Sequence, residues 1–155
     1  MRILKAGLIA GLVGGALDII AAMTIYPAMY PGATWMRVLQ SVAAGVLGRE
    51  AARAGGMGAA LLGLALHMVI AICAGLVLAY AMKHEAALRR LAPLTGAGFG
   101  VAMYYFMQKI VLPLSATGGG GAPDAKGLAV GLAIHIFIFG IPMALIARQF
   151  LSEKD

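Results

Sequence analysis

Four apolar segments dominate this sequence, and each is long enough to cross a lipid bilayer as an α-helix. They cover approximately residues 6–26, 57–82, 93–114 and 127–147. An α-helix rises about 1.5 Å per residue, so about 20 apolar residues span a hydrocarbon core of about 30 Å. The sequence therefore predicts one all-α domain over residues 1–155, an integral membrane four-helix bundle.

The composition also favours lipid as the surrounding solvent. Of the 155 residues, 62% are hydrophobic and only 12% are charged. A soluble domain carries about twice that charged fraction, and a fold this small could not hide so much apolar surface from water. The formal net charge of +6 does not indicate nucleic acid as a partner, because the basic residues are scattered between the apolar segments and form no basic stripe with interleaved aromatic residues.

The basic residues predict the orientation of the bundle, because loops on the cytoplasmic side carry an excess of lysine and arginine. With the N-terminus in the cytoplasm, seven basic residues lie on the inner side: Arg2, Lys5, Lys83, Arg89, Arg90, Arg148 and Lys154. The outer side carries Arg37, Arg49, Arg53 and Lys126, with Lys109 near it. We therefore expect a multi-pass protein with both termini in the cytoplasm.

The first outer loop, residues 27–56, contains a short amphipathic helix at approximately residues 34–48. Its apolar residues recur at helical spacing: Trp35, Val38, Leu39, Val42 and Val46. The polar residues Arg37, Gln40 and Ser41 lie on the other side. Two interpretations stay open. The helix lies in the membrane interface with Trp35 as an anchor among the headgroups, or it packs on its own bundle.

A short internal repeat indicates that the bundle consists of two tandem helical hairpins. The second segment contains Gly-Leu-Ala-Leu-His ending at His67, and the fourth contains Gly-Leu-Ala-Ile-His ending at His135. Hairpins separated by an even number of crossings have the same orientation, so they would be related by an approximate twofold axis along the membrane normal. His67 and His135 would then lie on opposite sides of that axis.

The polar residues inside the apolar segments are the candidate functional residues, because ionisable groups are costly in hydrocarbon and usually face the bundle interior. Counted from the outer helix ends at about 1.5 Å per residue, Asp18, His67 and His135 all lie roughly 12–18 Å deep, and Gln108 lies slightly nearer the surface. Helical stripes of small residues place Tyr104 and Gln108 on inward faces. Lys109 lies on a different face near a helix end, so we exclude it.

The predicted cluster, Asp18, His67, Tyr104, Gln108 and His135, permits several kinds of chemistry. A buried aspartate can be neutralised by a proton or paired with a histidine that carries the charge. The cluster could therefore relay protons, hold an ion or bind a small polar solute. Alternatively, its members are hydrogen-bonded contacts between helices and nothing more.

A cofactor is a further alternative, although we expect none. His67 and His135 could be the axial ligands of one haem, or could form a transition-metal site with Asp18. No catalytic residue is predicted, because Cys73 and the serines have no activating neighbour in the sequence. We therefore do not expect an enzyme.

Three prolines lie at or inside the helices. Pro27 and Pro113 lie at the outer ends of the first and third segments, where a missing N–H does little harm. Pro142 lies inside the fourth segment, so it predicts a free carbonyl near residue 138 and a kink, to which Gly140 adds flexibility.

The order of these residues resembles small bacterial inner-membrane proteins of the YagU-like type. The similar features are a glycine-rich first helix with Asp18, His67 among apolar residues, Met107-Gln108 ahead of Pro113, and His135 followed by Phe139-Gly140. The resemblance implies a four-helix protein of the bacterial inner (plasma) membrane and no particular activity. The long first outer loop departs from it.

Three functions remain as predictions. The first is a small membrane protein, working as a homo-oligomer, whose polar cluster binds or relays a proton, ion or small polar solute. The second is a non-catalytic accessory subunit that packs against a larger membrane complex through its glycine-lined faces. The third is a single-haem or metal-binding redox protein.

Overall fold

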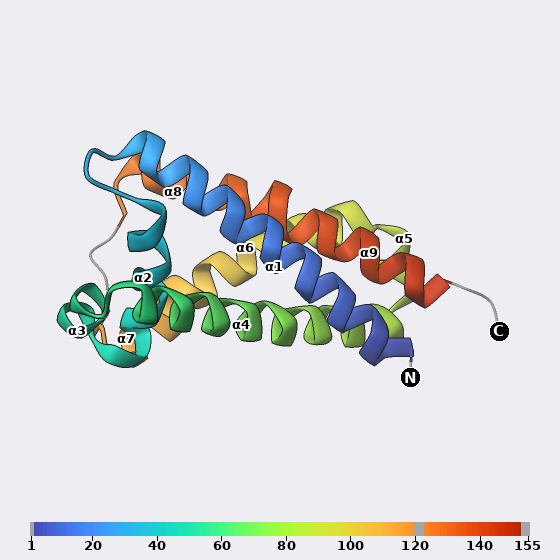
Figure 1. Cartoon of the computed structure of the whole chain (residues 1–155). Helices are drawn as coiled ribbons and strands as arrows, with labels where there is room; N and C mark the ends of the chain where they lie inside the picture. The colour runs from blue at the N-terminus through green and yellow to red at the C-terminus, as the bar shows by residue number, and fades with distance from the viewer. Residues whose placement is uncertain (1, 120–122, 153–155) are drawn as a thin grey trace.

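The computed structural model describes residues 2–119 and 123–152, and its regular secondary structure there is entirely helical (Figure 1). The elements are α1 (Arg2–Met29), α2 (Trp35–Leu47), α3 (Arg49–Ala54), α4 (Gly56–His84), α5 (Ala86–Arg90), α6 (Ala92–Phe106), η1 (Met107–Val111), α7 (Leu112–Leu114), α8 (Ala125–Ala133), η2 (Ile134–Gly140) and α9 (Ile141–Ser152). Two of them, η1 and η2, are π-helical. The prediction of an all-α fold is confirmed.

Three helices in the described ranges are long and apolar enough to cross a membrane: Arg2–Met29, Gly56–His84 and Ala125–Ser152. The last is the continuous run of α8, η2 and α9. The remaining predicted span, 93–114, is helical from Ala92 to Leu114, but it contains polar residues in its second half: Tyr104, Tyr105, Gln108 and Lys109. It is therefore a helix of lower hydropathy than the other three.

The three long helices pack against one another, and α6 lies to one side of them. Helix α1 packs on α4 around Gly7, Gly11 and Gly15 and diverges from it toward the α2 end (Figure 1). It also contacts α9 and η2, whereas α6 packs on η2 and α9 and does not pack closely on α4. An approximate twofold axis relating the two hairpins would place α6 on α4 just as α1 lies on α9. The predicted twofold arrangement is therefore wrong, and the two histidine motifs have different surroundings.

Glycines set the close packing between these helices. A Cβ atom on Gly75 of α4 would lie 2.8 Å from Gly11 Cα of α1, and one on Gly100 of α6 would lie 2.7 Å from the carbonyl carbon of His135. Real Cβ atoms essentially never approach so closely. Gly75 and Gly100 are therefore occupied by contacts within the chain.

Each π-helix ends two residues before a proline, η1 before Pro113 and η2 before Pro142. In η2 the N–H of Ile141 donates to the carbonyl of Ile136, five residues earlier. Proline has no N–H to donate, and a widened turn is one way a helix adapts to it. The distortion predicted at Pro142 thus takes the form of a π-helix, which contains His135. Pro27 lies inside α1 rather than after it.

Helix α2 lies across one end of the long helices and packs on α4 and α1 (Figure 1). The side chain of Thr34 accepts a hydrogen bond from the N–H of Arg37 at 3.2 Å and so caps its N-terminus. The buried face includes Gln40, whose Nε2 donates to the carbonyl of Gly56 at 3.0 Å. The prediction that Gln40 faces outward is therefore wrong. The helix packs on its own bundle and still leaves Trp35 47% exposed.

The first and last described residues lie together at the opposite end of the molecule from α2 (Figure 1). The Lys5 ammonium lies 5.2 Å from the ring centroid of Phe150, which joins the start of α1 to the end of α9. Helix α5 is at the same end. The guanidinium of Arg89 donates there to the carbonyls of Met82 and Lys83, so it caps the C-terminus of α4.

Candidate functional site

Asp18 lies at the centre of the molecule, on the face of α1 that meets both neighbouring helices. Gly14 and Gly15 precede it by one turn, and their missing side chains let Met143 of α9 and Ala71 of α4 approach closely. Asp18 is only 7% exposed. Its Oδ1 atom is buried and accepts no hydrogen bond from any described residue. Burying a polar atom without a hydrogen-bond partner costs free energy of folding, so the stability of the fold does not explain why an aspartate occupies this position.

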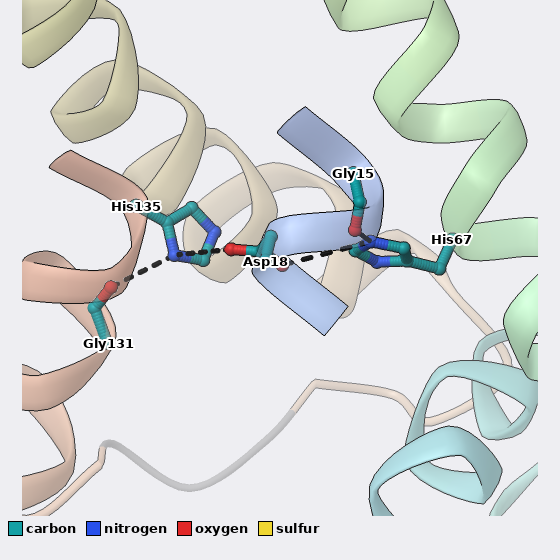
Figure 2. Close-up of polar contacts among 5 residues, drawn as sticks. All are labelled: Gly15, Asp18, His67, Gly131 and His135. Atoms are coloured by element: carbon teal, nitrogen blue, oxygen red, sulfur yellow. Dashed lines mark hydrogen bonds and ion pairs between the residues drawn. The ribbon is translucent and has the colours of Figure 1, made fainter. Parts of the chain in front are cut away.

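The histidines of two of the long apolar helices approach this carboxylate from opposite sides. His67 comes from α4, and its Nε2 lies 3.8 Å from Asp18 Oδ2. His135 comes from η2, and its Nδ1 lies 3.9 Å from Asp18 Oδ1. Figure 2 shows the carboxylate between the two rings. Both separations exceed a hydrogen bond, so the aspartate is near both imidazoles and bonded to neither.

Backbone carbonyls fix the orientation of both rings. Nε2 of His67 lies 2.9 Å from the carbonyl oxygen of Gly15, and Nδ1 of His135 lies 2.9 Å from that of Gly131 (Figure 2). A carbonyl only accepts, so each of these nitrogens must carry a hydrogen and donate it. The neutral rings therefore keep their lone pairs on Nδ1 of His67 and Nε2 of His135, and a further proton would bind there.

A cavity of about 380 Å³ adjoins this group. It lies between α1, α2, α4, η1 and η2, in the region where α6 and η1 do not close against α4. The predicted residues Asp18, His67, Gln108 and His135 all line it. Its lining also reaches Ser41 on α2. Four of the five predicted site residues therefore surround one cavity.

Tyr104, the fifth predicted residue, is buried beside His135 but does not line the cavity. Its ring meets the imidazole edge-on, with centroids 5.4 Å apart and planes at 82°, and it also packs against Gly131. It therefore supports the histidine. Sequence reasoning missed Tyr26, which lines the cavity two turns after Asp18. Tyr26 follows Asp18 by eight residues, so helical spacing places both on the same face of α1, and this spacing could have identified it.

The arrangement does not fit a haem held between the two histidines. A porphyrin bound by both rings would have to lie between them, and that space holds α1 and the Asp18 carboxylate (Figure 2). Among residues 2–119 and 123–152, no group of three or more histidine, cysteine, aspartate or glutamate side chains is placed to hold a metal ion.

A second acidic residue lies outside the cavity, near the α2 end. The Tyr30 hydroxyl donates to Asp124 Oδ1 at 2.7 Å, and the N–H of Gly127 donates to the same oxygen at 2.7 Å. These two bonds lower the pKa of Asp124 below its ordinary value, and the bond to Asp124 raises the pKa of Tyr30. The contact ties the end of α1 to the start of α8.

No family model, curated protein or solved structure is significantly similar to this chain. The resemblance to YagU-like proteins therefore stays a prediction.

Proposed function

We propose that the chain is a four-span protein of the bacterial inner membrane that binds or relays a proton, or binds a small polar solute, at Asp18. Three helices of sufficient length and hydropathy support insertion. The helix Ala92–Leu114, packed on η2 and α9, would be the fourth span, with Gln108 lining the cavity. Both termini at one end agree with an even number of crossings (Figure 1).

The single observation that carries the proposal is the unpartnered Oδ1 of Asp18, next to a cavity and between two histidines. If the three polar residues only joined helices, direct hydrogen bonds between aspartate and imidazole would be expected. Instead, each imidazole N–H donates to a backbone carbonyl and leaves the carboxylate free. An ionised carboxylate in this position needs a positive partner, which is a protonated imidazole or a bound ligand.

A polar solute is favoured over a metal cation by the charge around the cavity, and a proton is favoured by the two imidazoles that line it. A second cavity shares Ser41 and Leu112 with the first, and it is lined by Arg37, Arg49 and Arg53. Three guanidinium groups at this side repel an approaching cation. Imidazole, in turn, is the side chain that most readily exchanges a proton near neutral pH.

The test is proton flux into proteoliposomes that contain the purified chain, followed with a pH-sensitive dye after a pH gradient is imposed. We expect flux above that of protein-free vesicles, and its loss in Asp18→Asn, which keeps the shape of the side chain. Glu50→Gln is the matched control, because it removes an exposed carboxylate that does not line either cavity. Equal flux in wild type and Asp18→Asn would refute a proton relay.

The solute alternative has its own readout. A solute site would give no proton flux in wild type, and a small polar solute would raise the unfolding midpoint of the protein. Asp18→Asn would then abolish that rise in the midpoint, whereas Glu50→Gln would keep it. If neither protons nor solutes distinguish wild type from Asp18→Asn, the polar cluster has no binding role.

A further inference from the structure

Three arginines surround a second cavity of about 310 Å³ at the α2 end of the molecule. Arg37 comes from the first turn of α2, and Arg49 and Arg53 come from successive turns of the same face of α3. The other lining residues are Gln40, Ser41, Ala44, Leu112 and Thr117, so none of the lining residues is acidic. Like charges gathered around one concavity repel one another unless an anion neutralises them.

The backbone around this cavity is held in place by specific bonds. The N–H of Ala116 donates to the carbonyl of Gly45 at 2.9 Å, which ties the segment after α7 to α2. Nη2 of Arg49 donates to the carbonyl of Gly119 at 2.6 Å. Gly48, with φ of 78°, provides the turn that brings α3 back beside α2. The three arginines therefore lie on helices whose backbone is held by hydrogen bonds, and not on a flexible loop.

Nearby carboxylates do not neutralise these arginines. The described acidic residues at this end are Glu50 and Asp124, and neither lines the cavity. Asp124 is already bonded to Tyr30 and Gly127. The described residues therefore leave a concavity that is lined by three arginines and by no carboxylate.

The elements around this cavity also carry exposed apolar side chains. On α2, Trp35 is 47% and Val46 61% exposed, and Leu114 at the end of α7 is 83% exposed. The same end of the molecule therefore offers an arginine-lined cavity and exposed tryptophan and aliphatic side chains on α2 and α7, and a phospholipid requires both, a site for its phosphate and a surface for its acyl chains.

We propose that Arg37, Arg49 and Arg53 bind the phosphate of an anionic phospholipid headgroup at the outer interface of the membrane. Arginine is suited to this role because its planar fork donates two parallel hydrogen bonds to phosphate oxygens. The site rests on the proposed membrane insertion but not on proton or solute binding at Asp18. Asp18→Asn is therefore expected to bind the lipid as wild type does, which separates the two proposals.

The test measures lipid binding by the purified chain in mild detergent, with native mass spectrometry and the thermal unfolding midpoint as readouts. The ligands are phosphatidylglycerol, zwitterionic phosphatidylcholine, soluble glycerol phosphate and inorganic phosphate. We expect phosphatidylglycerol to bind and to raise the midpoint, and the other three to have little effect. The double variant Arg37→Gln/Arg53→Gln should weaken this binding by at least about tenfold, because two charge-assisted contacts are lost.

Two further variants allow the proposal to be tested even if the glutamine variant folds poorly. Arg37→Lys/Arg53→Lys keeps the charge but loses the planar fork, so it should bind with intermediate affinity. Lys126→Gln removes a cation at the same end that does not line the cavity, so it should bind as wild type does. Equal phosphatidylglycerol binding by wild type and the arginine-to-glutamine variant would overturn the site. An equal effect of glycerol phosphate or inorganic phosphate would overturn its assignment to a lipid.

Discussion

Replacing Gly100 by alanine is expected to separate α6 from η2 and to displace His135. The added Cβ would lie 2.7 Å from the carbonyl carbon of His135 and 3.0 Å from Ile136 Cα, whereas ordinary van der Waals contact begins at 3.4 Å. Because the carbonyl oxygen of His135 would lie closer still, the two backbones must move apart by more than about 0.7 Å, and neither side has a flexible side chain at the contact that could yield instead. Overpacking of this kind costs about 1–3 kcal/mol.

Gly98 provides the control on the same helix, since a Cβ there meets nothing within 4 Å. Gly98→Ala should be neutral or slightly stabilising, because alanine favours the helix over glycine. Equilibrium unfolding in mixed micelles, followed by circular dichroism, should give a free energy of unfolding about 2 kcal/mol lower for Gly100→Ala than for Gly98→Ala. Equal stability of the two variants would refute the close α6–η2 packing that positions His135.

Three further predictions concern the two ends and the outer surface of the bundle. Arg89→Gln should lower the free energy of unfolding by about 1 kcal/mol, because two carbonyls at the end of α4 lose their donor, while the exposed Arg90→Gln should have little effect. Carbon NMR should place the pKa of Asp124 below its ordinary value of 3.8, and Tyr30→Phe should raise it toward that value. Since a lowered carboxyl pKa stabilises the fold above the ordinary value, the contribution of this contact is lost as the pH falls through the lowered pKa. Cys73, exposed on the side of α4, should resist a charged maleimide in intact vesicles and react after unfolding in detergent, because the surrounding lipid would exclude the charged reagent.

The hydrophobic pattern was enough to predict the helical class and the approximate bounds of the long helices, because apolar length is a strong signal in membrane-type sequences. Helical spacing also predicted that Asp18 is buried and that Gln108 shares a cavity with the histidines. The rise per residue of a helix is nearly constant, so residues at equal distances from the ends of neighbouring helices lie at similar heights along the bundle. This is why counting residues from the helix ends brought Asp18, His67 and His135 together.

The arrangement of the helices around that level was not predictable from the pattern. The repeated Gly-Leu-Ala motifs suggested equivalent hairpins, yet Gly63 packs against Leu39 of α2 and Gly131 packs against the ring of Tyr104. Identical local sequences therefore meet different partners, because long-range packing determines their surroundings. The prediction that Gln40 faces outward was wrong for a related reason. Its amide bonds to the Gly56 carbonyl in the turn before α4, a tertiary contact that amphipathic spacing does not reveal.

The most direct test of the central claim is nitrogen NMR of the labelled histidines in lipid bilayers. The geometry predicts that neutral His67 carries its hydrogen on Nε2 and neutral His135 on Nδ1, since those nitrogens donate to the carbonyls of Gly15 and Gly131. It also predicts that Asp18→Asn shifts the nitrogen resonances of both rings, because the carboxylate lies within 4 Å of each. Opposite tautomers, or ring resonances that Asp18→Asn leaves unchanged, would contradict a shared site around Asp18.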